Sequence, residues 1–328
     1  MDLIDIGITV GKVVIIFGAL MGMVAYMTLF ERRVIAFIQG RIGPNRVGFQ
    51  GLLQPIADAV KLLFKEDVTP AGANKFLFAI APMLSFIPTL LTIAVIPVAE
   101  SSTIFGREVD WIISDINIGI LFVLAVTAME VYGIIIGGWA SNSKYPLLGA
   151  LRASAQMISY EVSLGLALVG LLMVTGTFSM TEIVAQQSSF LQWNIFKQPL
   201  GFLLFIIGAF AEVNRIPFDL PEAEAELVGG YNTEFSSMKF AMYFMGEYAA
   251  MISISAIMVT LYFGGWQGPI LPSPIWFLLK VGAFLFTFVW VRGTLPRFRY
   301  DQLMRFGWLV LLPLALFNIF ITGVIMVL

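Results

Sequence analysis

Eight runs of apolar residues, each about long enough to cross a lipid bilayer, dominate this sequence. The hydrocarbon core of a bilayer is about 30 Å thick, so a spanning helix needs about 20 mostly apolar residues. We expect spans at about 8–30, 76–99, 116–139, 151–175, 197–215, 239–263, 275–294 and 306–328. The fifth is the weakest, because a run of only thirteen apolar residues precedes Glu212. With 59% hydrophobic and 12% charged residues, the chain is predicted to be an all-α polytopic membrane protein with a single integral-membrane domain, residues 1–328.

The positions of Lys and Arg predict how the spans are oriented. Fifteen of the nineteen basic residues lie in the loops after spans one, three, five and seven, or in the adjoining ends of spans. Loops rich in Lys and Arg stay on the cytoplasmic side of a membrane. We therefore expect the odd-numbered loops in the cytoplasm and both termini on the outer side.

The absence of two residue types limits the chemistry of the chain. It has no Cys and no His, which are the usual protein ligands of iron–sulfur clusters, haem and zinc. We expect no bound cofactor or redox centre and no metal site. If the chain serves redox chemistry, a different protein must carry the electrons.

A short amphipathic helix is expected in the largest cytoplasmic segment, 31–75. It begins at Pro55 and has an apolar face that includes Ile56 and Val60, while Asp58 and Lys61 lie elsewhere on it. This pattern fits a helix lying at the membrane surface, and it fits equally a helix packed on neighbouring spans.

Three glutamates interrupt otherwise apolar spans. Glu130, Glu161 and Glu247 lie about 12–15 Å from the inner ends of their spans at 1.5 Å per residue, and Glu212 lies near the inner end of the fifth. An ionised side chain at the bilayer centre costs roughly 2.5–3.5 kcal/mol, so these groups should face protein or water. A buried carboxyl group can exchange a proton near neutral pH. We interpret the three as a proton path, although each could separately be a protonated packing residue.

The segment RIPFDLPEAEAELVGGYNTEF, residues 215–235, concentrates negative charge between two apolar runs. Its five carboxylates are Asp219, Glu222, Glu224, Glu226 and Glu234. A solvated acidic face would keep such a loop soluble. That reading leaves the interleaved Phe218, Leu227 and Tyr231 unexplained, so we favour a loop that forms the cytoplasmic end of the line of acids.

Five separated stretches resemble one family along nearly the whole chain. They are FERRVIAFIQGRIGPNRVGFQGLLQPIADAVKLLFKED (30–67), SKYPLLGALRASAQMISYEVSLGL (143–166), AEVNRIPFDLPEAEAELVGGYNTEFSSMKFAMYFMGEY (211–248), FGGWQGP (263–269) and LPRFRYDQLM (295–304). They are similar to the H subunits of respiratory complex I, the proton-pumping NADH:quinone oxidoreductase. The GPNRVG and NRIPFDLPEAEAELVGGYN segments carry most of the resemblance, because they are long and unusual in composition.

The resemblance implies a function that the residues alone do not. Members of this family join a hydrophilic arm, which holds flavin and iron–sulfur clusters, to a proton-pumping membrane arm. Quinone is the substrate: it enters near the surface helix, passes along a chamber roofed by cytoplasmic loops, and reacts beyond this part of the complex. The resemblance further implies the bacterial inner membrane as location. The implied partners are the hydrophilic quinone-site and iron–sulfur subunits, small membrane-arm subunits, and lipid.

The resemblance also assigns roles to individual positions. Those matching the proton path and its coupling are Glu130, Glu161, Glu212, Glu222, Glu224, Glu226 and Glu247. Those matching the quinone passage and its roof are Glu31, Arg32, Arg41, Arg46, Asp58, Lys61, Arg215, Phe218, Asp219, Arg292, Arg297 and Arg299.

Two other functions remain open at this point. A membrane subunit of an energy-converting hydrogenase would use the same acids without quinone. A free-standing cation/proton antiporter would explain the buried acids, but it would leave the GPNRVG segment and the acidic loop unexplained.

Overall fold

The computed structural model describes residues 3–104, 106–219 and 230–328, and these are mostly helical. The helices are α1 (Leu3–Ile38), α2 (Gln54–Phe64), α3 (Lys75–Leu91), α4 (Gly119–Ala140), α5 (Lys144–Thr175), α6 (Met180–Ala185), α7 (Asn194–Lys197), α8 (Pro199–Glu212), α9 (Ser237–Tyr262), α10 (Ser273–Thr294), α11 (Tyr300–Phe306) and α12 (Leu312–Val327). A π-helical turn, Gly307–Leu311, joins α11 to α12. The predicted class, an all-α polytopic membrane protein, is confirmed.

Seven helical segments of the described chain are long and apolar enough to cross a membrane, where the sequence predicted about eight. The expected fifth span corresponds to α8, which has 14 residues. At 1.5 Å per residue α8 is about 21 Å long, which is less than the roughly 30 Å of a hydrocarbon core. By length, therefore, α8 does not qualify as a complete span, and its C-terminal residue Glu212 lies within the protein.

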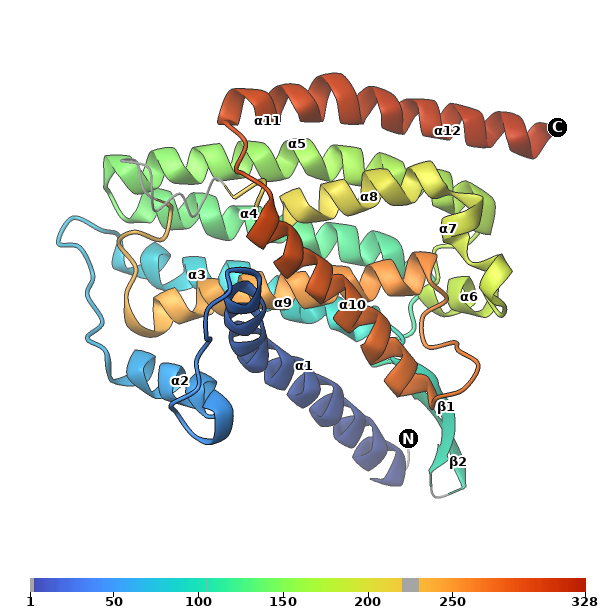
Figure 1. Cartoon of the computed structure of the whole chain (residues 1–328), viewed down its shortest axis with the longest axis horizontal. Helices are drawn as coiled ribbons and strands as arrows, with labels where there is room; N and C mark the ends of the chain where they lie inside the picture. The colour runs from blue at the N-terminus through green and yellow to red at the C-terminus, as the bar shows by residue number, and fades with distance from the viewer. Residues whose placement is uncertain (1–2, 105, 220–229) are drawn as a thin grey trace.

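Helix α9 forms the centre of the bundle (Figure 1). In its most apolar stretch 83% of the residues are buried, against 28% for α1 and α10 and 22% for the segment Tyr300–Val327. A helix that is apolar on all sides lies either among other helices or in lipid, and the burial of α9 shows that other helices surround it. Side chains carried by α9, including Glu247 and Tyr248, are therefore held inside the protein.

Two glycines of α4 make room for its neighbours, the backbone of α3 and a side chain of α9. A Cβ atom at Gly133 would lie 2.6 Å from the backbone nitrogen of Ser85 on α3, and one at Gly137 would lie 2.2 Å from the hydroxyl of Tyr243 on α9. That hydroxyl donates a hydrogen bond to the carbonyl of Gly133, at 3.1 Å. Small residues at this spacing bring helix backbones together, and here they let α3 pack closely on α4 and make room for the Tyr243 side chain of α9.

The amphipathic helix α2 begins at Gln54, one residue before the predicted start. Its apolar side chains are exposed, with Ile56 at 56% and Phe64 at 88% of full accessibility. A helix packed on neighbouring spans would bury this face. The structure therefore favours the interpretation in which α2 lies at the membrane surface.

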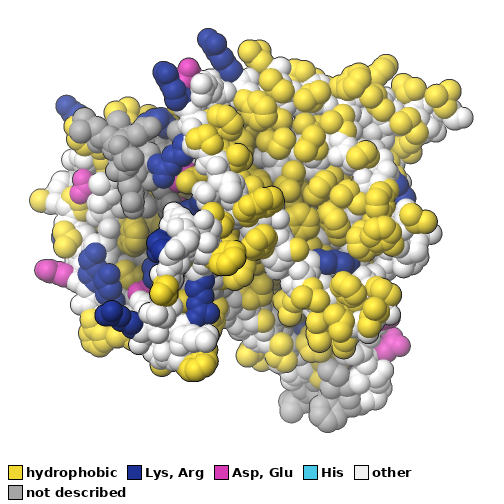
Figure 2. Space-filling view, viewed as in Figure 1, with side chains coloured by type: hydrophobic (Ala, Val, Ile, Leu, Met, Phe, Trp, Pro, Cys, Tyr) yellow, Lys and Arg dark blue, Asp and Glu magenta, His cyan; other side chains and the backbone are white. Residues whose placement is uncertain are grey.

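A two-stranded antiparallel sheet lies at the end of the molecule opposite α2 (Figure 1). Strand β1 is Ala99–Ile104 and β2 is Arg107–Trp111, within a segment that the sequence predicted as an outer loop. Figure 2 shows Lys and Arg side chains gathered around α2 and the start of α11, with an apolar surface over α8, α10 and α12. The separation of basic and apolar surfaces fits helices that start at a charged end of the molecule and cross the hydrocarbon of a membrane.

Candidate functional site

Glu31, in the C-terminal part of α1, is the meeting point of four chain segments. Its carboxylate accepts hydrogen bonds from Arg215 Nη1 at 3.3 Å and from the hydroxyl of Tyr248 at 2.6 Å, and it also accepts one from Arg292 on α10. The guanidinium of Arg215 lies over the Tyr248 ring, 4.6 Å from its centroid. Glu31 and Arg215 are each 3% exposed. We call these four residues the Glu31 cluster; in it, two cations stabilise one buried carboxylate.

A cavity of about 230 Å³ lies between α1, α2 and α9, beside the Glu31 cluster. One part of its wall is charged: Arg32 Nη1 and Asp58 Oδ2 form an ion pair of 2.7 Å, and Lys61 is next to them. Another part is apolar and includes Phe244. Tyr248 lines the cavity and also donates to Glu31. This space, which we call the α2 cavity, therefore ends against the Glu31 cluster.

The segment that follows α8 is held in place by hydrogen bonds to distant parts of the chain. The side-chain nitrogen of Gln156, on α5, donates to the carbonyl oxygens of Phe218 at 2.7 Å and Ala211 at 3.0 Å. Arg297 Nη2 lies 3.0 Å from Asp219 Oδ2, and that carboxylate is buried. The predicted residues Phe218, Asp219 and Arg297 thus lie together, next to the loop between α10 and α11.

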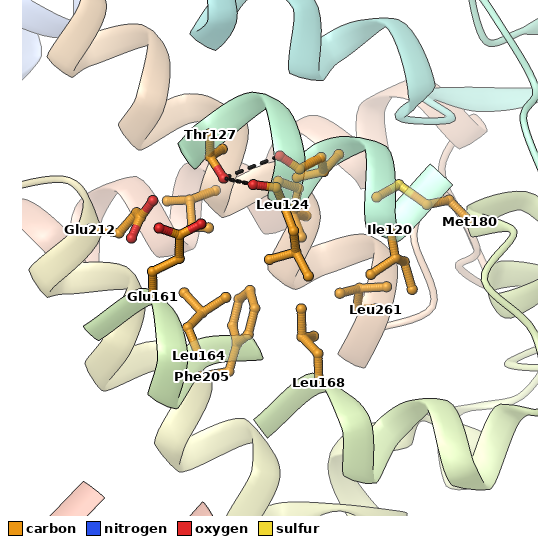
Figure 3. A pocket seen from close by; sticks show the side chains of 13 residues that line it. Ile120, Leu124, Thr127, Glu161, Leu164, Leu168, Met180, Phe205, Glu212 and Leu261 are labelled. Atoms are coloured by element: carbon orange, nitrogen blue, oxygen red, sulfur yellow. Dashed lines mark hydrogen bonds between the residues drawn. The ribbon is translucent and has the colours of Figure 1, made fainter. Parts of the chain in front are cut away.

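Glu161 and Glu212 lie together at one end of a narrow cavity between α4, α5, α8 and α9 (Figure 3). The cavity has a volume of about 20 Å³, enough for about one water molecule. Beyond the two acids its walls are mostly apolar and include Leu124 and Phe205. Glu212 is 7% exposed, and its Oε2 has no hydrogen-bond partner among the described residues.

The other two predicted acids are also buried. Glu130, on α4, hydrogen-bonds to Ser85 of α3 and lies within electrostatic range of Glu212. Glu247 is buried on α9, and a Cβ at the preceding Gly246 would lie 3.8 Å from the carbonyl oxygen of Ser85. The acids thus extend across α5, α8, α4 and α9. Within 3–104, 106–219 and 230–328, no group of three His, Cys, Asp or Glu side chains is arranged to hold a metal ion.

Other predicted residues lie outside these groups. Arg41 and Arg46 are exposed, and Arg41 Nε lies 2.6 Å from the side-chain oxygen of Gln39. Arg299 is exposed and pairs at 3.4 Å with Asp301 in its own helix turn. The remaining three predicted positions lie outside the described residues: Glu222, Glu224 and Glu226.

Two residues of the site were absent from the predicted set. Tyr248 connects the α2 cavity to Glu31, and Gln156 anchors the segment after α8. A signal for Gln156 was present, because a polar amide within an apolar span needs buried hydrogen-bond partners. Its partners lie 55 and 62 residues away in sequence, so only the packing of the helices identifies them.

Comparison with known proteins places the chain among respiratory membrane proteins. The family model described as NADH dehydrogenase matches residues 11–323. The NADH-quinone oxidoreductase H subunit 1 of Geobacter metallireducens is 53% identical over 325 residues, which cover 99% of this chain and 98% of that protein. The NADH-quinone oxidoreductase H subunit of Thermomicrobium roseum is 52% identical over 319 residues, covering 95% of this chain and 94% of the relative.

Proposed function

Because the chain belongs to the NADH dehydrogenase family, we propose that it acts as a membrane subunit of a proton-translocating NADH:quinone oxidoreductase. Flavin and iron–sulfur clusters are then carried by partner subunits, and quinone is the substrate. The proposed location is the bacterial inner membrane, with residues 1–328 forming one membrane domain. The distribution of Lys and Arg supports both termini on the outer side.

The observation that carries the quinone role is the position of Tyr248, between the α2 cavity and Glu31. An amphiphile with an apolar tail and a polar head needs an apolar wall that leads to polar groups. The α2 cavity has such a wall, which includes Phe244, and Tyr248 at its end hydrogen-bonds to Glu31. Quinone would enter beside α2, pass Arg32 and Asp58, and continue under the loops that hold Arg215 and Arg297.

The cationic side chains at this passage suit the negative charge that develops on quinone during reduction. Reduction to quinol takes up two electrons and two protons, so negative charge develops transiently before protonation is complete. In the Glu31 cluster the guanidiniums of Arg215 and Arg292 meet one carboxylate. Cationic groups stabilise negative charge nearby, so their place beside the α2 cavity supports the passage as part of a quinone site.

The buried acids supply the proposed proton path. Two ionised carboxylates side by side repel each other, so Glu161 and Glu212 favour a state in which they share a proton. Their cavity has space for about one water molecule, through which a proton could move between them. Because acids this close titrate as a coupled set, a change of charge at one end redistributes protons towards Glu130 and Glu247.

The acidic loop is the proposed coupling element between quinone and the buried acids. Its described beginning is attached to α5 through Gln156 and to the α10–α11 loop through Arg297. We expect a double variant, Glu224→Gln with Glu226→Gln, to reduce quinone quickly but to pump no protons. Unimpaired pumping by that variant would count against coupling through the loop.

Affinity purification in mild detergent tests the assignment as a whole. The tagged chain is isolated from its own membranes, its companions are identified, and NADH:quinone activity is assayed. We expect flavin and iron–sulfur subunits, and quinone reduction that is sensitive to quinone-site inhibitors.

Two other outcomes would contradict the assignment in different ways. Recovery with nickel–iron hydrogenase subunits would remove the quinone role and leave the proton path. Recovery of the chain alone, with ion flux in liposomes, would indicate an antiporter. The oxidoreductase names of relatives that match over nearly their full length favour the first outcome.

A further inference from the structure

A second large cavity lies far from α2, under the β1–β2 hairpin. It has a volume of about 550 Å³ and is bounded by α1, α9, α10 and β1. On α1 its lining runs from Ile15 to Met23, and on α10 from Ser273 to Val281. Eight residues of helix rise about 12 Å, so the cavity is an elongated groove along these two helices. We call it the hairpin cavity.

The lining of the hairpin cavity changes from apolar to polar along its length. Hydrocarbon side chains such as Leu20 and Phe277 form most of the wall. At the hairpin the lining includes the polar residues Glu100 and Ser273. A groove that is apolar along its length and polar at one end matches a molecule with a hydrocarbon chain and a polar head.

The groove is open to the surroundings of the helices. Ile15 and Leu278 line it, and 57% and 47% of their respective side chains are exposed. Both lie on helices whose faces are mostly exposed and apolar. A molecule in the groove would therefore come from the hydrocarbon of the membrane.

Contacts at both sides hold the hairpin over the groove. Arg107 of β2 forms an ion pair with Asp5 of α1. On the other side, the backbone nitrogen of Glu100 lies 3.4 Å from the hydroxyl of Ser273 at the start of α10. The polar end of the groove is therefore attached to both helices that form its walls.

The charge at the polar end distinguishes between classes of lipid headgroup. Glu100 also lines an adjacent cavity of about 760 Å³, together with Trp193, Trp276 and Lys280. Lys280 is the one basic side chain among the described residues that line either cavity. Its ammonium group already donates to the carbonyls of residues 263, 265 and 267, at 2.7, 3.0 and 2.7 Å.

Lys280 has three donors in total, and all three are used by these carbonyls. It lines only the adjacent cavity, where it also lies over the ring of Trp193, 4.7 Å from the centroid. Glu100, by contrast, is an exposed acidic residue, and no Lys or Arg is among the described residues that line the hairpin cavity. This end of the groove is complementary to an ammonium group.

We propose that the hairpin cavity is a specific phospholipid site: one acyl chain lies along α1 and α10, and a headgroup bearing an ammonium lies at Glu100. Phosphatidylethanolamine has this chemistry. The site is separate from the α2 cavity and from the buried acids, and it does not depend on the role proposed for either.

Lipid competition on the intact complex tests this proposal. The complex is purified from its own membranes, stripped of lipid with detergent, incubated with vesicles of equimolar phosphatidylethanolamine and phosphatidylglycerol, and washed. Mass spectrometry then counts the bound lipids. Wild type should retain phosphatidylethanolamine in preference.

Ala19→Phe, which fills the groove from an exposed position on α1, should lose the preferred lipid, whereas Ala283→Phe, with equal bulk on an exposed part of α10 outside the groove, should retain it.

The headgroup is tested by a second pair of variants on the hairpin. Glu100→Gln should lower the preference for phosphatidylethanolamine by about two- to fivefold, the range expected for an exposed charge pair. Glu108→Gln, at an exposed position of β2 outside the cavity, should leave the preference unchanged. Equal retention of both lipids by wild type, or equal behaviour of Ala19→Phe and Ala283→Phe, would overturn the proposal.

A partner protein in the groove would also overturn it. Because the chain has no cysteine, Ile15→Cys and Leu278→Cys each provide a single site for crosslinking. Efficient crosslinking of both to a neighbouring protein would show that protein covers the groove. Reaction of both with a thiol reagent carried on a lipid would support the proposed occupant.

Discussion

The Glu31 cluster and the Glu161–Glu212 pair both contain buried carboxyl groups, but only in the Glu31 cluster do cationic side chains bind the carboxylate. Glu31 accepts hydrogen bonds from two guanidiniums and a tyrosine hydroxyl. Glu161 and Glu212 lie beside each other, and the rest of their cavity is lined by apolar residues and Thr127. A carboxylate held by two cations is stabilised in its charged form, whereas two neighbouring acids disfavour ionisation of both at once.

This difference separates a cluster that fixes neighbouring chain segments from a pair of acids whose proton content can change. The Glu31 cluster connects α1, α9, α10 and the segment after α8, so it holds in place the walls of the proposed quinone passage. The Glu161–Glu212 pair can change its proton content without breaking an ion pair. The same residue type therefore holds segments together in one region and, in the proposed function, carries protons in the other.

The largest effect on stability is expected from Glu31→Gln. The change leaves the buried guanidinium of Arg215 without its carboxylate, and breaking a buried ion pair costs about 3–5 kcal/mol. We expect much less chain in the membrane and a clearly lower midpoint in thermal unfolding of the purified complex. Glu108→Gln, at an exposed position, is the control. Stability equal to that control would mean that the cluster does not hold these segments together.

A smaller loss is expected from Gln156→Leu. Leucine fills a similar volume but leaves the carbonyl oxygen of Phe218 without the Gln156 donor, at about 1–3 kcal/mol for a buried unsatisfied group. Limited proteolysis should cut the chain faster near residues 215–219. Gln192→Leu, at an exposed position, is the control. Unchanged cleavage would show that Gln156 does not anchor this segment.

The exposed pair of Arg32 and Asp58 should matter less to stability. Their side chains are 48% and 31% exposed, and such pairs contribute about 0–1 kcal/mol. Arg32→Gln should leave the unfolding midpoint nearly unchanged but raise the KM for quinone, because it alters the wall of the α2 cavity. Lys65→Gln, at an exposed position outside the cavity, should change neither quantity. A KM equal to that of Lys65→Gln would argue against entry beside α2.

The smallest effect on stability is expected from Glu212→Gln. The substitution keeps the shape of the side chain and removes an acid whose cavity is lined by no Lys or Arg among the described residues, so the midpoint should stay the same or rise slightly. A loss as large as that of Glu31→Gln would contradict the contrast between the two regions. Thermal unfolding of both variants under the same conditions makes the comparison direct.

The sequence predicted many of the site residues but few of their hydrogen-bond and ion-pair partners. Apolar runs locate helices because the bilayer requires them, and a charge within such a run stands out. Glu130, Glu161 and Glu247 were therefore visible as candidates. The pairing of Glu31 with Arg215 joins residues 184 positions apart, and it depends on how α1 and the segment after α8 pack against α9.

Two features of the fold were predicted incompletely for physical reasons. The expected fifth span was longer than α8, because it was extended to residue 215, whereas the helix ends at Glu212 and Asn214 takes a positive φ of 52°. The hairpin of β1 and β2 lies in a short polar loop, where local preference is weak and contacts with Asp5 and Ser273 decide the conformation. Both features depend on contacts that are distant in sequence.

Proton pumping by Glu161→Gln tests the central claim most directly. The complex carrying this variant is reconstituted in liposomes, and proton uptake and NADH oxidation are recorded together. Removal of a relay acid should lower the pumping rate by on the order of a hundredfold, within the range for loss of an acid–base group, and Glu161→Asp should restore part of it. Pumping at the wild-type ratio of protons to NADH in Glu161→Gln would contradict the account.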